Sequence, residues 1–289
     1  MKLKEAVAKY VTKKEQQQVP SAFDIIGTIA VFNDFPKELK KKEKKIAEVL
    51  MQLHPSITTV AKKTGKFSGR LRTPKITIIA GKKTKETMHK ENGCVLKLDI
   101  GKCYFSPRLA SERLRVAKLV KKDEKVLVLF SGVAPYPCVI AKNAQPKEIL
   151  AIELNKIAHR YAQENIKINK MSNIILYQGD IKKVLPKIKK TFDRIIMPLP
   201  KDSPTYLPLA LHYLKPKGTM HLYLFAREEE FTQVTAMYQK NGKWYVGWVE
   251  EIPGVNTQGR TLSEVKSNLQ EALSLVLEVN RAMAHKDVF

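Results

Sequence analysis

The sequence predicts an α/β protein in which a doubly wound, mostly parallel sheet lies between two smaller α+β parts. From Lys125 onward, short apolar strands alternate with helical stretches, a pattern that requires a sheet covered on both faces. The charge also changes sharply along the chain: the formal net charge is +24, yet residues 232–289 hold six basic and six acidic residues. This shift indicates a boundary near Phe231. We expect domains at 1–105, 106–231 and 232–289.

The first domain is predicted from three strands and one basic helix. Residues 21–32, 75–80 and 94–100 are apolar or alternating runs that are typical of strands. The helix begins in the run Lys37–Lys45 and continues to Leu53 with apolar residues at helical spacing. Together they predict a small α+β module over about residues 20–105.

The charge favours a polyanionic partner, and nucleic acid is the leading class. For any one lysine run, a solvated helix face is the alternative explanation. Basic pairs spread along the chain strengthen the case for contact with phosphates. The run contributes Lys40, Lys41 and Lys42 as candidate RNA-binding residues.

Other classes of protein are disfavoured. The three cysteines are too few and too scattered for a disulfide framework or a zinc site, and the histidines show no ligand spacing, so we expect no metal. No apolar stretch is long enough for a membrane span, and the N-terminus lacks a signal-peptide core. We expect a soluble, cytoplasmic protein.

In the central domain, chemically suitable groups follow three successive strands. The turn Phe130–Tyr136 contains Gly132, Glu153 ends the next strand, and Asp180 ends the strand after that. Ligands of open parallel sheets bind at these carboxyl ends. An acid about 20 residues after a glycine turn can accept ribose hydroxyls, and the absence of GxGxxG disfavours a dinucleotide. The pattern favours a nucleoside-bearing cofactor, with a purely structural role as the alternative.

The wording of several segments is more specific. The succession RTPKITIIAG, HKENGCVLKLDIGKCYFSPRLASERLRVA, VLVLFSGVAPYPCVIAK, AIELNKIAHRYAQENIKINK and FDRIIMPLPK, from about Ala22 to Phe225, resembles the archaeal and eukaryotic tRNA (guanine-N1)-methyltransferase family. The resemblance implies a Rossmann-like S-adenosylmethionine domain behind an RNA-facing domain, with methylation of the guanosine 3′ to the anticodon of tRNA. It assigns cofactor binding to Phe130, Ser131, Gly132, Val133, Pro135, Glu153, Leu154, Asp180 and Pro198.

The resemblance also implies the catalytic residues. Methyl transfer to guanine N1 requires a base beside N1 and a donor near O6. The family pattern places Glu112 as the base and Arg72 as the group that steadies O6. A carboxylate on the helix surface, paired with Arg115 or Lys118, is the alternative for Glu112. Arg70 and Arg108 compete with Arg72 for its role, or contact phosphate as RNA-binding residues.

Three positions depart from the family pattern. Val128 stands where many members have Asp, Ala134 where the second glycine usually lies, and Pro198 where an Asn helps to hold the reacting base. The alternatives that these departures leave are a catalytically weak RNA-binding protein and an enzyme that moves the aminocarboxypropyl group of the same cofactor.

The last segment is predicted as a β-sheet plus helix. An aromatic strand at 243–252 and a Gly- and Pro-containing turn at 253–259 precede a capping box formed by Thr261 and Glu264. From Met237 to Glu278 the sequence resembles the HicB-like antitoxin family. That resemblance implies a protein partner or self-association through this module, and a toxin-antitoxin regulator as a further alternative.

Overall fold

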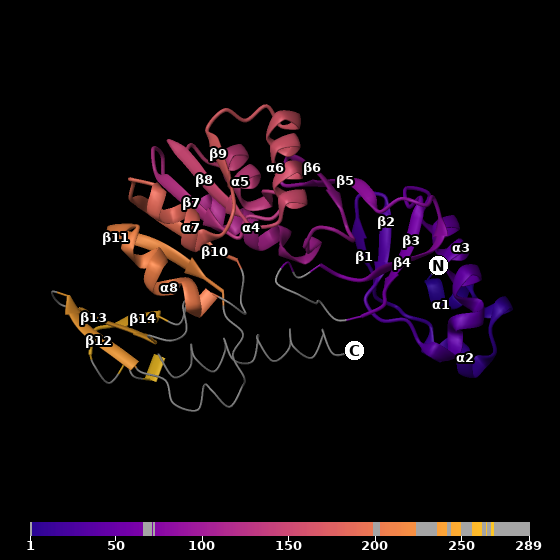
Figure 1. Ribbon diagram of the computed structural model, residues 1–289. Helices are drawn as coiled ribbons and strands as arrows, with labels where there is room; N and C mark the ends of the chain where they lie inside the picture. The colour runs from indigo at the N-terminus through magenta and orange to yellow at the C-terminus, as the bar shows by residue number, and fades with distance from the viewer. Residues whose placement is uncertain are drawn as a thin grey trace. The chain divides into compact units, whose positions relative to one another are not determined.

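The computed structural model describes residues 2–65, 71, 73–198, 203–223, 236–241, 244–249, 256–261, 264, 267 and 268. The chain divides into two compact units, Met1–Leu224 and Phe225–Phe289 (Figure 1). The boundary predicted near Phe231 falls among residues outside the described ranges. Each unit is considered by itself.

The first unit begins with a small mixed sheet in the order β1-β2-β3-β4. Its strands are β1 (Asp24–Ile26), β2 (Ile29–Phe32), β3 (Thr59–Lys63) and β4 (Ile76–Gly81), preceded by helices α1 (Leu3–Ala6), η1 (Ala8–Tyr10) and α2 (Lys13–Gln18). The segment 21–32, predicted as one strand, is a hairpin. Gly27 forms its turn with φ +57°, and a Cβ there would meet Met88 O at 2.4 Å.

The basic segment forms a 3-10 helix, η2 (Lys37–Lys42), that runs into α3 (Glu43–Leu53). Apolar residues of α3 pack in the N-terminal core, and the lysines lie on the other side. Burial of this one face is what stabilises a helix whose first half is so rich in like charges. The predicted amphipathic basic helix is therefore confirmed, with a tighter first turn.

A hairpin of β5 (Glu86–Glu91) and β6 (Cys94–Asp99) joins this sheet to the next part of the unit. β5 contacts β1, and β6 contacts helix α6 (Lys156–Ile168). Asn165 accepts from Lys97 N at 2.7 Å, and Asn169 accepts from Val95 N at 2.8 Å. The sequence analysis placed residues 94–100 in the first domain. The side chains of Asn165 and Asn169 instead connect the edge of β6 to α6, a helix of the central domain.

The second sheet is parallel throughout, in the order β11-β10-β7-β8-β9. Its strands are β7 (Lys125–Leu129), β8 (Glu148–Glu153), β9 (Ile174–Gln178), β10 (Phe192–Met197) and β11 (Leu214–Leu222). Val126 and Val128 face one core cluster while Leu127 and Leu129 face another. This alternation confirms a sheet buried on both faces, as in the doubly wound class.

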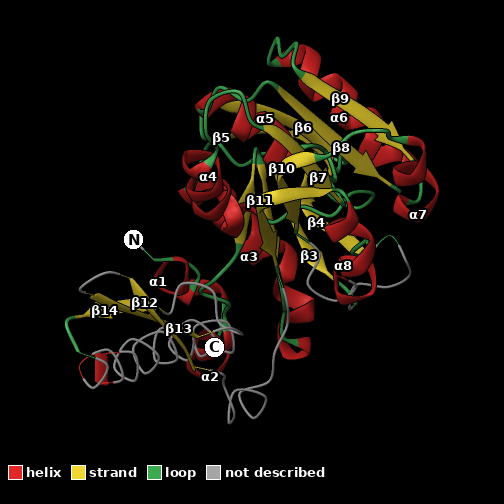
Figure 2. Ribbon diagram, turned by 90° about the vertical axis from the view of Figure 1, so that its left-hand side faces the viewer, coloured by secondary structure: helices red, strands yellow, loops and turns green. Residues whose placement is uncertain are grey.

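Helices cover both faces of this sheet (Figure 2). These helices are, besides α6, η3 (Pro107–Leu109), α4 (Ala110–Leu119), α5 (Pro135–Asn143), α7 (Ile181–Val184), η4 (Leu185–Lys187) and α8 (Ser203–His212). The apolar residues of α4, α5 and α6 pack in one cluster, and those of α7, η4 and α8 pack in the other. The arrangement directs the carboxyl ends of the strands toward the loops that carry the predicted site.

The second unit contains an antiparallel sheet of β12 (Ala236–Asn241), β13 (Trp244–Val249) and β14 (Asn256–Gly259). Glu264 N donates to Thr261 Oγ1 at 3.1 Å, half of the predicted capping box. Most of the helix predicted to follow lies outside the described residues. Among the residues that the structure describes, no helix is long and apolar enough to cross a membrane.

Candidate active site

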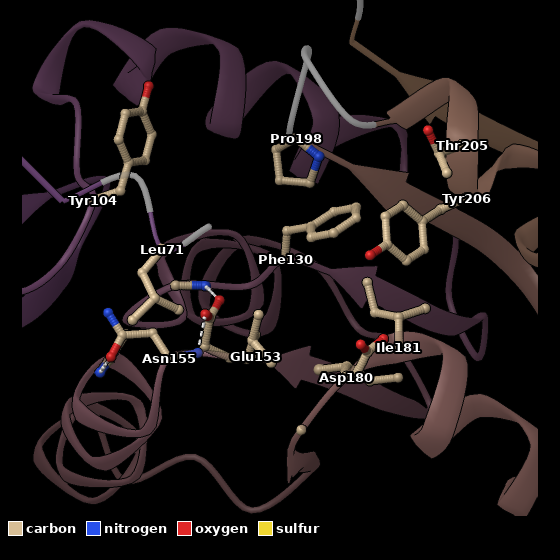
Figure 3. Close-up of a pocket in the computed structure, with 15 residues that line it drawn as sticks. Leu71, Tyr104, Phe130, Glu153, Asn155, Asp180, Ile181, Pro198, Thr205 and Tyr206 are labelled. Carbon is tan, nitrogen blue, oxygen red and sulfur yellow. Dashed lines mark hydrogen bonds between the residues drawn. The ribbon is translucent and has the colours of Figure 1, made fainter. Parts of the chain in front are cut away.

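A cavity of about 300 Å³ opens at the carboxyl ends of β7, β8, β9 and β10 (Figure 3). This volume lies at the lower end of the range for small-molecule sites, about 300–1,000 Å³. Its walls come from the loops after these four strands, from the segments after β6 and before β4, and from the first turns of α6, α7 and α8. The lining residues are Leu71, Tyr104, Phe130, Gly132, Ile152, Glu153, Leu154, Asn155, Ala158, Gly179, Asp180, Ile181, Pro198, Thr205 and Tyr206.

The turn after β7 is folded through left-handed backbone conformations. Phe130, Gly132 and Ala134 have φ of +55°, +57° and +66°. A Cβ on Gly132 would meet nothing nearer than Tyr104 O at 3.7 Å, so the glycine is favoured by its φ rather than by lack of space. Ala134, which departs from the family pattern, adopts a conformation that glycine adopts more easily.

Glu153 is the most firmly placed acid of the cavity. It accepts from Gly132 N at 2.6 Å and from Asn155 N at 2.7 Å, and both bonds are among the dashed lines of Figure 3. Burial raises the pKa of Glu153, and these backbone N–H groups oppose the rise. Asn155 is itself fixed, because it caps α6 and donates to Lys102 O at 2.8 Å. The carboxylate is therefore oriented before any ligand arrives.

Asp180 occupies the next carboxyl end. Its side chain caps α7 by accepting from Lys182 N at 2.9 Å. Beside it, the rings of Phe130 and Tyr206 meet edge to face with centroids 5.2 Å apart, and Lys182 Nζ lies 5.4 Å from the centroid of the Tyr206 ring. The cavity thus combines two acidic acceptors with an aromatic wall.

Glu112 does not line this cavity. Arg115 donates to its two oxygens from Nε at 2.6 Å and Nη2 at 2.7 Å, and the Tyr223 hydroxyl donates to Oε1. Partial burial raises the pKa of Glu112, but these hydrogen bonds and the Arg115 charge outweigh burial and lower it overall. The pairing with Arg115, which the sequence offered as the alternative to a catalytic role, is present, and Tyr223 is a partner that the sequence did not indicate.

Tyr223 lies at the same edge of the sheet as the cavity. Leu222 pairs with Met197, and Tyr223 and Pro198 are the residues that follow them. Pro198 lines the cavity, as Figure 3 shows. Glu112 is therefore linked through Tyr223 to the strand next to the cavity wall.

The other predicted site residues differ in where the structure places them. Phe130, Gly132, Glu153, Leu154, Asp180 and Pro198 line the cavity, whereas Ser131, Val133 and Pro135 lie in the same turn without lining it. Arg70 and Arg72 lie outside the described residues. Arg108 pairs with Asp24 at 2.9 Å and Lys42 with Glu15 at 2.5 Å, while Lys40 and Lys41 are exposed.

Sequence reasoning missed several cavity residues. Asn155 carried a detectable signal, because an Asn directly before a helix is a preferred N-cap. Tyr104, Thr205 and Tyr206 carried none, since only the fold brings their segments to the carboxyl ends of the strands.

Comparison with known proteins supports this interpretation of the fold. The TRM5/TYW2 methyltransferase domain matches residues 87–243, and the TYW2 N-terminal domain matches residues 3–84. The tRNA (guanine(37)-N(1))-methyltransferase Trm5b of Pyrococcus abyssi is 39% identical over 218 residues, which are 75% of this chain and 64% of that protein. The tRNA(Phe) (4-demethylwyosine(37)-C(7)) aminocarboxypropyltransferase of Methanocaldococcus jannaschii is 37% identical over 160 residues, 55% of this chain and 63% of that one.

Among solved structures, the complex of aTrm5 with tRNALeu superposes with a TM-score of 0.67 at 28% identity, covering 76% of this chain and 64% of that one. The chain thus spans just under two thirds of each of these three proteins. The methyltransferase domain nevertheless accounts for more than half of the present sequence. This chain belongs to the TRM5/TYW2 methyltransferase family.

Proposed function

We propose that this protein transfers a methyl group from S-adenosylmethionine to N1 of the guanosine at position 37 of tRNA. The observation that carries the proposal is the cavity itself, in which Glu153 is held by Gly132 and Asn155 at the end of β8. The similarity to Trm5b, named as a tRNA (guanine(37)-N(1))-methyltransferase, supports the choice of reaction.

The residues present suit this cofactor. The oxygen atoms of Glu153 can accept hydrogen bonds from ribose hydroxyls, and those of Asp180 can accept a hydrogen bond from the amino group of adenine. Phe130, Ile152 and Tyr206 offer apolar surface to the flat base. When bound, S-adenosylmethionine supplies an electrophilic methyl group on a sulfonium centre. The chain binds and orients it and excludes water from it.

We propose that Glu112 is the general base that accepts the N1 proton of the guanine. As the N1–methyl bond forms, the N1 proton must leave, and an ionised carboxylate accepts it. The lowered pKa of Glu112 keeps it in this ionised form at neutral pH. The role of Arg72 at O6 stays a prediction, because that residue lies outside the described ranges.

The N-terminal domain is the proposed RNA-binding surface. Exposed lysines on η2 and the start of α3 leave a basic face: Lys37, Lys40, Lys41, Lys44 and Lys45. Lys42 contributes less in the absence of RNA, because it is paired with Glu15. Counterion release predicts that tRNA binding by this face weakens steeply with salt.

The test is incubation of the full chain with tRNA and S-adenosylmethionine labelled in the methyl group, followed by nucleoside analysis. We expect label in 1-methylguanosine at position 37. Glu112→Gln keeps the shape of the side chain and removes the base, so it should retain cofactor binding and lose transfer. Absence of cofactor binding at millimolar concentration would contradict the proposal at its first step.

A second candidate reaction is aminocarboxypropyl transfer from the same cofactor. The relative from Methanocaldococcus jannaschii and the match of residues 3–84 to the TYW2 N-terminal domain favour it. Cofactor labelled separately in the methyl and in the aminocarboxypropyl carbons distinguishes the two reactions. Transfer of only the second label would replace the first proposal.

For the Phe225–Phe289 unit we keep the HicB-like interpretation as a proposal, with protein contact or self-association as its role. Its three-stranded antiparallel sheet and the Thr261–Glu264 cap agree with a small α+β module. Sedimentation of the full chain and of a chain ending at Leu224 tests this. Equal association states would remove the proposed role.

A further inference from the structure

The carboxylate of Glu112 ends a chain of hydroxyl groups that comes from two other elements. Tyr136 of α5 donates to the Tyr223 hydroxyl at 2.9 Å, and Tyr223, which follows β11, donates to Glu112 Oε1. An ionised carboxylate only accepts, so Tyr223 must give its single proton to Glu112 and accept from Tyr136. The direction of both bonds is therefore fixed while Glu112 is ionised.

The two oxygens of Glu112 are unequally occupied. Among the residues that the structure describes, Oε1 accepts from Tyr223 and from Arg115 Nη2, whereas Oε2 accepts only from Arg115 Nε. A carboxylate oxygen accommodates about two donors. Oε1 is thus filled, and Oε2 keeps one position at which it can accept a proton.

We propose that Tyr223 is a positioning residue for Glu112: its hydroxyl fills Oε1, holds the carboxylate in one orientation and leaves Oε2 as the atom that takes the proton of the target base. This inference rests on the proposed role of Glu112 as the base. Tyr223 itself touches neither cofactor nor substrate in this scheme.

Arg115 alone is poorly suited to hold the carboxylate. Its side chain is 57% exposed, and exposed ion pairs are screened by solvent and contribute little. Tyr136 is 3% exposed and packs in the core on which α4 and α5 lie. The hydroxyl chain is anchored in that core, so it can keep the carboxylate oriented when phosphates of an RNA attract Arg115.

In the part of the chain that the structure describes, the groups that face Glu112 leave few other sources of a pH effect. Arg115 approaches from its own helix, Tyr136 from α5, and Tyr223 and His221 from β11 and the residue after it. Burial and the nearby charges of Arg194 and Arg115 lower the pKa of His221 to about 4, so it is neutral above that pH. The neighbouring Arg113 is occupied by Glu91.

The test is the titration of Glu112 in the full chain with and without the Tyr223 hydroxyl. Glutamate labelled with ¹³C at the carboxyl carbon is followed by NMR across pH, and the Glu112 signal is identified by its loss in Glu112→Gln. Loss of a donor to a charged group is expected to raise the Glu112 midpoint by about 1 pH unit in Tyr223→Phe. Tyr136→Phe should raise it less, because Tyr223 stays in place.

Tyr177→Phe is the matched control, since it removes an exposed tyrosine hydroxyl from β9 and should leave the midpoint unchanged. An unchanged midpoint in Tyr223→Phe would overturn the inference. If Tyr223→Phe does not fold, Tyr136→Phe decides, and an unchanged midpoint there overturns it equally.

The rate of methyl transfer gives a separate readout. In Tyr223→Phe the low-pH limb of the kcat/KM profile should shift to higher pH by the same number of pH units as the Glu112 carboxyl midpoint. A loss by one constant factor at every pH would indicate a merely structural role and would overturn the inference. If the unmodified chain transfers no methyl group, the proposed function fails, while the carboxyl titration still tests the role of Tyr223.

Discussion

The buried ion pair between Arg113 and Glu91 offers the sharpest test of how α4 is held. Arg113 Nε and Nη2 each donate to a Glu91 oxygen at 2.6 Å, and the two side chains are 2% and 3% exposed. Arg113 Nη2 also donates to Ser106 O at 3.0 Å. The pair joins α4, which carries Glu112, to the β5–β6 hairpin.

Arg113→Met removes the partner that binds both Glu91 oxygens and leaves the carboxylate buried beside His89, whose Nε2 lies 3.5 Å from Glu91 Oε2. Breaking a buried pair from one side costs about 3–5 kcal/mol of the free energy of unfolding. For a unit of this size, each kcal/mol lowers Tm by about 2–4 °C, so we expect a fall of roughly 6–20 °C. Far-UV circular dichroism measures it, because both tryptophans lie in the Phe225–Phe289 unit.

The control is the double variant Glu91→Leu with Arg113→Met, which buries no unpaired charge. It should recover much of the loss, since replacing both partners by apolar groups is often close to neutral. The reasoning would be refuted if Arg113→Met cost less than about 1 kcal/mol, or if the double variant were less stable by the sum of the two single losses.

Three further predictions concern Glu153 at the end of β8, Gly27 in the first hairpin and His221 in β11. Glu153→Gln replaces one acceptor oxygen by an NH2 group, which would face the N–H donor of Gly132 or of Asn155. Because one of these donors loses its partner, calorimetry should show S-adenosylmethionine binding weakened by about 10–100-fold. Gly27→Ala should destabilise the first unit far more than Gly132→Ala in urea denaturation, because only at Gly27 would the new Cβ collide with backbone, at 2.4 Å from Met88 O. The pKa of His221 is lowered from 6.5 to about 4, so the folded state binds this proton less tightly than the unfolded state. Stability should therefore fall as pH drops from about 6.5 to 4, and His221→Gln should flatten that slope.

Much of the central domain could be predicted from local pattern. The apolar strands around Val126, Ile149 and Ile195 are short and continuous, and such runs occur where both faces of a sheet are buried. The acids Glu153 and Asp180 followed from their position at strand ends, and the structure brings both to one cavity. In these cases a few adjacent residues contained the whole signal.

The contact between Glu112 and Tyr223 could not be predicted in the same way. Tyr223 lies 111 residues from Glu112 in sequence, and nothing around either residue indicates the other. The strand at 86–91 was missed because its polar residues are satisfied by tertiary contacts, such as Glu91 with Arg113 and Glu86 with Tyr161. A sequence pattern contains burial and spacing but not these distant partners.

The departures from the family pattern divide along the same line. On the cofactor side, the backbone N–H groups of Gly132 and Asn155 orient Glu153, and a change of side chain at Val128 or Ala134 does not remove these donors. Under the proposed function, an Asn at position 198 would help to hold the target base, and Pro198 has no side-chain amide for that role. Of the three departures, the one at Pro198 therefore bears most directly on base positioning. The carboxylate of Glu112, in contrast, is held by Tyr223 from a separate element. Its orientation therefore does not depend on the side chain at position 198.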